Sequence, residues 1–496
     1  MKRIFIVGLF FVSATAWAAV KPHALISDNM VLQQGMAVPI WGTANDGEQV
    51  TVKFAGQTVT TTAQAGRWMV RLSPLPANAT PQTMTITGEN TVTINNVLVG
   101  EVWLCGGQSN MAFGLGNAAD AAVHLAGAND PLLRLITIPR TGKAEPQQDV
   151  EAKWLPCTSS NVAGFSAVGY FFGRDLRRAR GVPVGLINAN VGGTAAERWL
   201  SREALAAEPA LKHILDEHAR ALTNYAAARE QFKKDEPQLL AQWQVAVKKA
   251  KAEGKPAPKQ PVAPKNPVTN GPSTLYNAMI APLQPFALAG VIWYQGESNA
   301  RRAQEYQTLF PALIHCWRAA WNRPELPFLF VQIAPHHSQP PEIREAQLLS
   351  WKKVPHTAMV VITDYGDAGN IHPKQKEPVG ARLALAARAI AYGEKIEYSG
   401  PVYESFKVDG HNVILSFSHV DGGLVAKGGA LKGFTISGDG TNFVPAVAQI
   451  VGETVVVSSP EVAKPVAVRY GWANVPDVNL FNKADLPASP FRTDAP

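Results

Sequence analysis

Residues 102–110, with the sequence VWLCGGQSN, decide the fold of this chain. The first half of this stretch is a continuous apolar run, and the second half is a glycine turn that leads to Ser109. A strand with no polar alternation is buried on both faces, which is typical of a parallel sheet covered by helices. We therefore expect strands and helices to alternate in the residues that follow.

The sequence after this stretch shows that alternation. Further apolar strands are predicted at 182–194, 290–298, 327–334 and 357–364. Residues 166–180 have the spacing of an amphipathic helix, and a helical segment at 380–393 closes the series. Apolar strands that alternate with helices predict an α/β domain with a parallel sheet, which we place at residues 99–397.

Both flanks of this domain are predicted to be β structure. At residues 20–98 apolar and polar positions alternate, as at Val50, Val52 and Phe54, which predicts a small β-sandwich. Residues 398–496 return to the same pattern and predict a second β module. Within the α/β domain, residues 201–270 combine charged helical segments with a Lys/Pro-rich tail. There we expect an inserted helical hairpin on the surface.

The N-terminus predicts an exported protein. Residues 1–18 combine a basic start, an apolar run and a small-x-small site, which is the pattern of a signal peptide, so we expect a periplasmic or secreted protein. The formal net charge is +7, but lysines of the segment 248–267 carry much of the excess. Because no aromatic residue interrupts that segment, it indicates a solvated linker. We expect neither nucleic acid nor a membrane as partner, and the oligomeric state stays open.

Cysteine usage excludes a disulfide scaffold. The chain has Cys105, Cys157 and Cys316, and three cysteines cannot all pair within one chain. Apolar and aromatic neighbours predict that Cys105 and Cys316 are buried thiols. The spacing leaves open whether Cys105 pairs with Cys157.

Polar residues and glycines follow four of the predicted strands, at the edge where ligands bind in open α/β sheets. In chain order these groups are Gly107-Gln108-Ser109-Asn110, Gly192-Gly193-Thr194, Gln295-Gly296-Glu297-Ser298-Asn299, and Asp364 and Asp367 leading to His372. Together they contain the parts of an acyl-transfer site. Ser109 can act as nucleophile and His372 as its base. The backbone N–H groups of Ser109 and of Gly192 or Gly193, with an amide side chain, can hold the oxyanion.

Other chemistries fit these residues less well. The sequence around Ser109 does not match the G-x-S-x-G motif of α/β-hydrolases, and no H-E-x-x-H zinc motif is present. Glu297, Asp364 and Asp367 would suit a glycosidase, but that assignment leaves Ser109 and His372 without a role. A sugar-binding protein on an inactive hydrolase scaffold is a further alternative, which the intact Ser109 and His372 argue against. Acyl transfer of this kind requires no cofactor and no metal.

The segments WLCGGQSNM, WYQGESNA and DYGDAGNIHPKQKEPVGARLALAARA resemble signatures of the sialate O-acetylesterase family, a branch of the SGNH-type hydrolases. The resemblance covers nearly all of the chain after the signal peptide, except the Lys/Pro insertion. It implies a flavodoxin-like three-layer α/β/α hydrolase domain flanked by β modules. It also implies removal of acetyl groups from sialic acids or other acetylated sugars. An acetylxylan or other polysaccharide acetylesterase would use the same chemistry.

The resemblance also implies roles for individual residues. Ser109 would be the nucleophile and His372 the base. Gly192 or Gly193 would contribute to the oxyanion hole. A third oxyanion donor and substrate contacts would come from the block that holds Gln295, Glu297 and Asn299.

One position departs from the family pattern. Many SGNH hydrolases have an aspartate three residues before the histidine, where this chain has Gly369. Asp367 is our candidate for orienting His372. Asp364 or a backbone carbonyl is the alternative.

Overall fold

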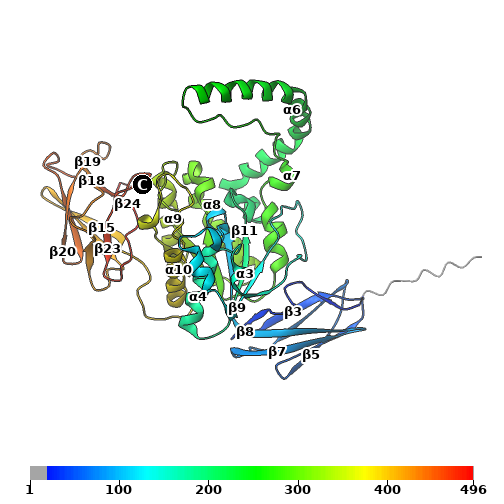
Figure 1. The fold of residues 1–496 in the computed structure, drawn as a ribbon. Helices are drawn as coiled ribbons and strands as arrows, with labels where there is room; N and C mark the ends of the chain where they lie inside the picture. The colour runs from blue at the N-terminus through cyan, green and yellow to red at the C-terminus, as the bar shows by residue number, and fades with distance from the viewer. Residues whose placement is uncertain (1–18, 495–496) are drawn as a thin grey trace, which may run out of the picture.

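The computed structural model describes residues 19–494, and Figure 1 shows its fold. The predicted signal peptide, residues 1–18, lies outside the described residues. The chain forms a mixed α/β structure with a large central sheet and further β-sheets toward both ends.

The central sheet has the strand order β10-β9-β11-β8-β12-β13-β14. Neighbouring strands run parallel, except that the edge strand β10 is antiparallel to β9. Every residue of β11, β12, β13 and β14 is buried, as the continuous apolar runs predict. The bounds are β8 (Thr91–Gly107), β9 (Asp130–Thr137), β10 (Leu155–Cys157), β11 (Val184–Asn190), β12 (Gly290–Tyr294), β13 (Phe328–Val331) and β14 (Thr357–Val360).

Strand β8 belongs to two sheets. Its first part pairs antiparallel with β7 (Asn78–Thr87), and its last part lies between β11 and β12. The boundary that we drew between residues 98 and 99 therefore falls inside one continuous strand. Because β8 carries the chain directly from the N-terminal sheets into the central sheet, no linker separates the two.

Two pairs of helices pack with the central sheet. Helix α4 (Ala167–Arg180) contacts α10 (Glu377–Ile390), and α8 (Ala303–Ala320) contacts α9 (Pro341–Lys353). The Trp103 ring of β8 meets Phe172 of α4 edge-on, with centroids 5.0 Å apart. The Trp293 ring of β12 meets Trp317 of α8 at 5.5 Å. The helix predicted at 166–180 is confirmed, and the Ser166 hydroxyl caps it by accepting the N–H of Gly169.

The N-terminal sheets bury the residues that alternate in the sequence. Val50, Val52 and Phe54 of β4 are buried, and the polar residues between them are more exposed. One sheet has the order β1-β3-β6, and the other contains β2, β4, β5 and β7 with β8. The bounds are β1 (Lys21–Pro22), β2 (Val31–Gln33), β3 (Val38–Thr43), β4 (Gln49–Phe54), β5 (Gln57–Thr62) and β6 (Arg67–Leu72).

The C-terminal residues form three further sheets, with the orders β15-β16-β21-β20, β17-β23 and β19-β18-β22-β24. The bounds are β15 (Val402–Asp409), β16 (Asn412–Ser418), β17 (Leu424–Ala426), β18 (Phe434–Ser437), β19 (Val444–Pro445), β20 (Val447–Val451), β21 (Thr454–Ser458), β22 (Ala467–Tyr470), β23 (Leu480–Asn482) and β24 (Phe491–Arg492).

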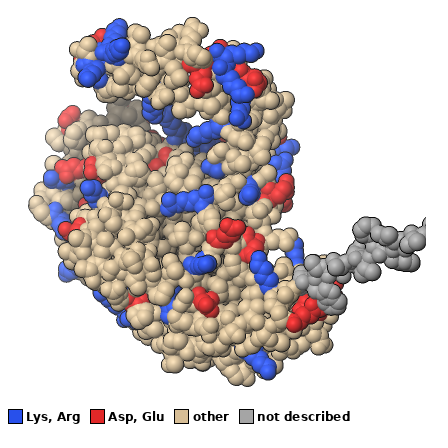
Figure 2. Space-filling model, turned by 45° about the vertical axis from the view of Figure 1, so that its right-hand side comes forward, with Lys and Arg blue, Asp and Glu red and all other residues tan. Residues whose placement is uncertain are grey.

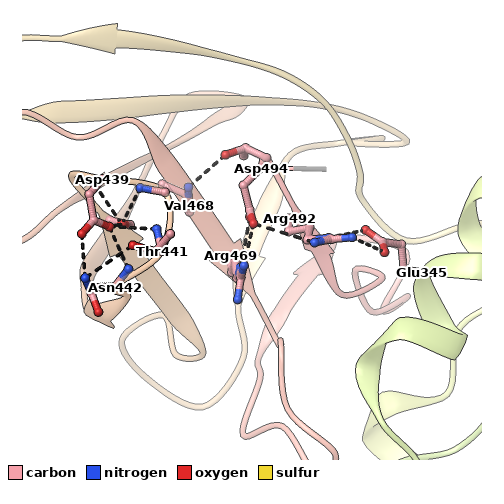
Figure 3. Close-up of polar contacts among 11 residues, drawn as sticks. Glu345, Asp439, Thr441, Asn442, Val468, Arg469, Arg492 and Asp494 are labelled. Atoms are coloured by element: carbon pink, nitrogen blue, oxygen red, sulfur yellow. Dashed lines mark hydrogen bonds and ion pairs between the residues drawn. The ribbon is translucent and has the colours of Figure 1, made fainter. Parts of the chain in front are cut away.

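Charged side chains connect the last strands to the helical layer, as Figure 3 shows. Arg492 of β24 donates two hydrogen bonds to the Glu345 carboxylate of α9, at 2.7 and 2.9 Å. On the neighbouring strand, Arg469 makes two hydrogen bonds with Asp494. In the same view Asp439 accepts the backbone N–H groups of a tight turn at Thr441 and Asn442. Paired guanidinium–carboxylate contacts are geometrically specific, so they orient the C-terminal sheets on α9.

The insertion differs from our expectation. The prediction of a helical hairpin is wrong. The helical segments after α5 (Arg202–Ala207) join into one helix, α6 (Lys212–Ala252), which continues through Pro237. The chain returns without helix at 255–266, where the Pro258 carbonyl accepts the Trp243 indole N–H at 2.8 Å.

Figure 1 shows α6 standing away from the sheet as an arm. Figure 2 shows lysine and arginine side chains on that arm. Only Ile214 and Leu215 of α6 are buried, so most of the arm is surface.

All three cysteines are buried and free, so Cys105 and Cys157 do not pair. Burial raises the pKa of the Cys157 thiol to about 12. Within residues 19–494, no helix has the length and apolar character needed to cross a membrane.

Candidate active site

The groups predicted from the strand ends lie together in the fold. Ser109 begins the short helix α1 (Ser109–Ala112) directly after β8. In the sheet, β8 lies between β11, which Gly192 follows, and β12, which Gln295 follows. His372 lies between β14 and α10. Since the carboxyl ends of parallel strands meet at one edge, Ser109 stands at the centre of that edge.

Glycine is required in the turn before Ser109. Gly107 has φ +136°, and a Cβ at this residue would lie 2.2 Å from the Tyr294 carbonyl oxygen of β12. Gln108 donates its backbone N–H to that same oxygen at 2.9 Å. The Gln108 side-chain oxygen accepts the N–H of Ser298 at 3.3 Å. The turn that presents Ser109 is therefore held against the end of β12.

The structure distinguishes Gly192 from Gly193, which the sequence analysis left as equal candidates for the oxyanion hole. A Cβ on Gly192 would lie 3.4 Å from the Ser109 Cβ, whereas a Cβ on Gly193 would meet nothing within 4 Å. Gly192 therefore borders the nucleophile position, and Gly193, at φ +67°, turns the chain away. Ser109 is the first residue of α1, and no described residue accepts its N–H. That N–H is free to meet an oxyanion.

His372 lies in a loop that holds its backbone and leaves its ring available. Its N–H donates to the Asn370 side-chain oxygen at 3.0 Å, and no described residue makes a hydrogen bond with the ring. Burial lowers the pKa of His372, and the charges of Lys376 and His336 lower it further. The ring is therefore neutral near pH 7, as a general base must be. Such hydrogen bonds to a nucleophile often form only when substrate binds.

The two candidate aspartates have different surroundings. Asp364 makes two hydrogen bonds with Arg382, at 2.8 and 2.6 Å, so both of its oxygens are occupied. Asp367 is exposed, and its Oδ1 accepts the N–H groups of Gly369 and Asn370 at 3.0 Å each. Oδ2 makes no hydrogen bond within the described residues. Asp367 thus caps the turn that leads to His372, and its orienting role stays a prediction.

Gln295 and Asn299 are buried and already have partners. The Gln295 amide donates to the Thr194 carbonyl at 3.2 Å and to the Asn299 side-chain oxygen at 2.7 Å. The Asn299 amide in turn donates to Glu197 at 3.0 Å. These contacts hold the residues after β11 against the end of β12. Both N–H groups of the Gln295 amide are used in these contacts, whereas Asn299 Nδ2 makes one hydrogen bond and keeps a second N–H. The donor role of either residue stays a prediction.

Two residues that the sequence analysis did not single out connect the site. The buried Asn110 side chain donates to Glu297 at 2.6 Å and to the Ile371 carbonyl at 3.0 Å. It accepts a hydrogen bond from the buried Lys376 ammonium at 2.6 Å. Asn110 follows Ser109, and Ile371 precedes His372, so these contacts bring the two catalytic candidates together. In the sequence Asn110 directly follows Ser109, and Lys376 lies four residues after His372, but neither residue type by itself indicates such a role.

A comparison with protein families identifies the family of this chain. A model described as "Carbohydrate esterase, sialic acid-specific acetylesterase" matches residues 99–228 and 265–389. The chain belongs to this family. The residues between the two matched ranges fall in the outer part of the α6 arm and its return.

Several known proteins are similar to this esterase over most of its length. A rat sialate O-acetylesterase is 32% identical, over 79% of this chain and 78% of its own. A human sialate O-acetylesterase is 31% identical, over 94% of this chain and 91% of its own. The crystal structure of a carbohydrate acetylesterase from Xanthomonas citri is 37% identical, with a TM-score of 0.82 over 96% of this chain and 100% of that one. We therefore assign carbohydrate O-acetylesterase activity to this esterase.

Proposed function

We propose that the esterase removes O-acetyl groups from sialic acids through an acyl-enzyme formed on Ser109. The observation that supports this most is the convergence of the strand ends. Ser109 follows the central strand, Gly192 borders it, and the Asn110 side chain connects its turn to the residue before His372. The sugar comes from the relatives, whose names specify sialate.

The chemistry would proceed in two steps. His372 takes the proton of the Ser109 hydroxyl while the oxygen attacks the acetyl carbonyl. The N–H groups of Ser109 and Gly192 hold the oxyanion. His372 then gives its proton to the leaving sugar oxygen as its bond to the acetyl carbon breaks, so the sugar departs with a free hydroxyl. In the second step His372 activates water, which releases acetate and restores Ser109. We propose that Asp367 orients the histidine through its free Oδ2.

We also propose a finer description of the fold. In chain order, the parallel strands β8, β11, β12, β13 and β14 have the spatial order 2-1-3-4-5, which is flavodoxin-like. This order supports a three-layer SGNH hydrolase domain at 99–397, with β9 and β10 added at one edge. The N- and C-terminal sheets would be β-sandwich modules. The pattern at residues 1–18 supports export to the periplasm or the medium.

An acetylated polysaccharide is the second candidate substrate. The X. citri relative is named a carbohydrate acetylesterase without reference to sialate, and it covers nearly the whole chain. The arm provides a long surface that lies partly outside the match to the family model. Acetate release from O-acetylated sialic acids and from acetylated xylan, measured side by side, distinguishes the candidates. Release from xylan alone would reject sialate as substrate.

Ser109→Ala tests the nucleophile. We expect kcat to fall by about 10⁶-fold, as it does when comparable hydrolases lose a nucleophile. A fluorophosphonate should label the wild type at Ser109, and the exposed Ser160→Ala should serve as a control that keeps both label and activity. Labelling at another serine, or a Ser109→Ala variant that retains a tenth of wild-type kcat, would reject the assignment.

A further inference from the structure

A cluster of buried polar side chains lies behind Ser109 and has no role in the mechanism above. We call Lys376, Asn110 and Glu297 the Lys376 cluster. Lys376 is 1% exposed, Asn110 0% and Glu297 8%. Within the cluster Lys376 Nζ donates to Asn110 Oδ1, and Asn110 Nδ2 donates to Glu297 Oε1, each at 2.6 Å. Asn110 follows β8, Glu297 follows β12, and Lys376 lies at the start of α10.

The surroundings of the cluster make it costly to bury. Lys376 Nζ lies 5.1 Å from the centre of the Phe113 ring and 5.4 Å from that of Tyr294. Glu297 Oε2 and the Tyr294 hydroxyl are buried without a hydrogen-bond partner among the described residues. Burial lowers the pKa of Lys376 to about 7 and raises the pKa of Glu297. Ionisable groups buried without a direct ion-pair partner are costly to the fold, so a functional role explains them better.

We propose that Lys376 is a positioning residue, which acts through Asn110 to fix the positions of Ser109 and His372 relative to each other. Lys376 fixes the Asn110 amide, and the other end of that amide donates to the Ile371 carbonyl at 3.0 Å. Asn110 is covalently joined to Ser109, and Ile371 to His372. One side chain therefore spans the two loops, and Lys376 sets its orientation. The proposal rests on the roles proposed above for Ser109 and His372.

The Lys376 charge has a second effect, on the base. The charged groups that act on His372 are Lys376, at the start of α10, and His336, from the loop after β13. Facing Lys376 in turn are Glu297 and Tyr294 from the end of β12. A cation beside the imidazole disfavours its protonation. Removing the ammonium should therefore raise the pKa of His372 and move the acidic limb of the kcat/KM profile to higher pH.

Lys376→Met and Lys376→Gln separate the two effects. Hydrolysis of p-nitrophenyl acetate is measured from pH 4.5 to 9, together with thermal melting. We expect the Met variant to lose 10-fold or more in kcat, with KM within about twofold, because misplacing reacting groups lowers kcat most. The Gln variant keeps a donor for Asn110 and should recover part of kcat. Both variants should shift the acidic limb of the kcat/KM profile to higher pH.

The exposed Lys374→Met is the matched control, since it removes the same charge two residues away. It should keep wild-type kcat and an unshifted limb. A Lys376→Met variant with kcat within threefold of wild type and an unshifted limb would overturn the proposal. So would failure of both Lys376 variants to fold, because Lys376 would then support the fold instead of the catalytic pair. Fluorophosphonate labelling of the wild type at another serine would reject the site itself, which is a different outcome.

Discussion

Gly192→Ala is the sharpest test of the site geometry. The backbone of Gly192 lies outside the left-handed region, so alanine fits there without strain. Its new methyl group would lie 3.4 Å from the Ser109 Cβ and 3.7 Å from the Ser109 Cα, which are ordinary contacts. We therefore expect a normal fold. Gly→Ala changes at compatible positions even stabilise proteins by about 0.4–1 kcal/mol.

The same methyl group should be costly for catalysis. It would occupy space beside Ser109 that the acetyl group and the oxyanion need. A displacement of about 1 Å at a reacting centre can cost on the order of 10²-fold in rate. We expect a loss of that size in kcat for p-nitrophenyl acetate, with an unchanged or slightly higher Tm.

Gly193→Ala is the matched control, and we expect the opposite result. Its φ of +67° is unfavourable for alanine, which costs about 1–2 kcal/mol. That cost should lower Tm by a few degrees. Because a methyl group there would meet no atom within 4 Å, kcat should stay near wild type. A Gly192→Ala variant within threefold of wild-type kcat, or a Gly193→Ala variant with the larger loss, would refute the assignment of Gly192 to the oxyanion hole.

Three further predictions test other parts of the site. Because burial and neighbouring cations lower the pKa of His372, the acidic limb of kcat/KM should lie below about 6.5, the usual histidine value; a limb above that value contradicts the assigned surroundings. Asp367→Asn keeps an oxygen that can cap the turn, so it tests the charge alone: we expect a loss of up to ~10⁴ in kcat with normal melting, and a loss below about tenfold rejects the orienting role. Replacing residues 248–267 with a Gly/Ser linker should leave ester hydrolysis intact, because the buried residues of α6 lie at its start, and an insoluble product would show that the segment packs into the fold.

The sequence predicted the parts of the fold that local rules control. Continuous apolar runs marked the strands of the central sheet, and the glycines at 106–107 marked the turn before Ser109. The path of β8 was not predictable, because Asn95, Asn96 and Gly100 are residue types that often mark turns, yet they lie inside one continuous strand. The hairpin was wrong for a related reason. The charged helical segments were interpreted as two helices, but they join into one exposed helix that continues through Pro237.

The candidate site was predictable at its surface and not in its interior. Ser109, Gly192 and His372 stand beside strand ends, where ligands bind in α/β sheets. Asn110 and Lys376 look like ordinary loop residues in the sequence, since long polar side chains are usually solvated. Their burial depends on how three segments from distant parts of the chain meet. No local pattern encodes that arrangement.

Gly369 stands where the SGNH hydrolases that the sequence resembles often have an aspartate, three residues before the histidine. A Cβ on Gly369 would lie 3.8 Å from Asp367 Oδ1, since the turn folds that carboxylate back over the glycine. Asp367 therefore brings its negative charge beside the position where the usual side chain would begin. Because Oδ1 is occupied by backbone N–H groups, Oδ2 would have to reach the imidazole, and the Lys376 cluster would fix the loop from the opposite side.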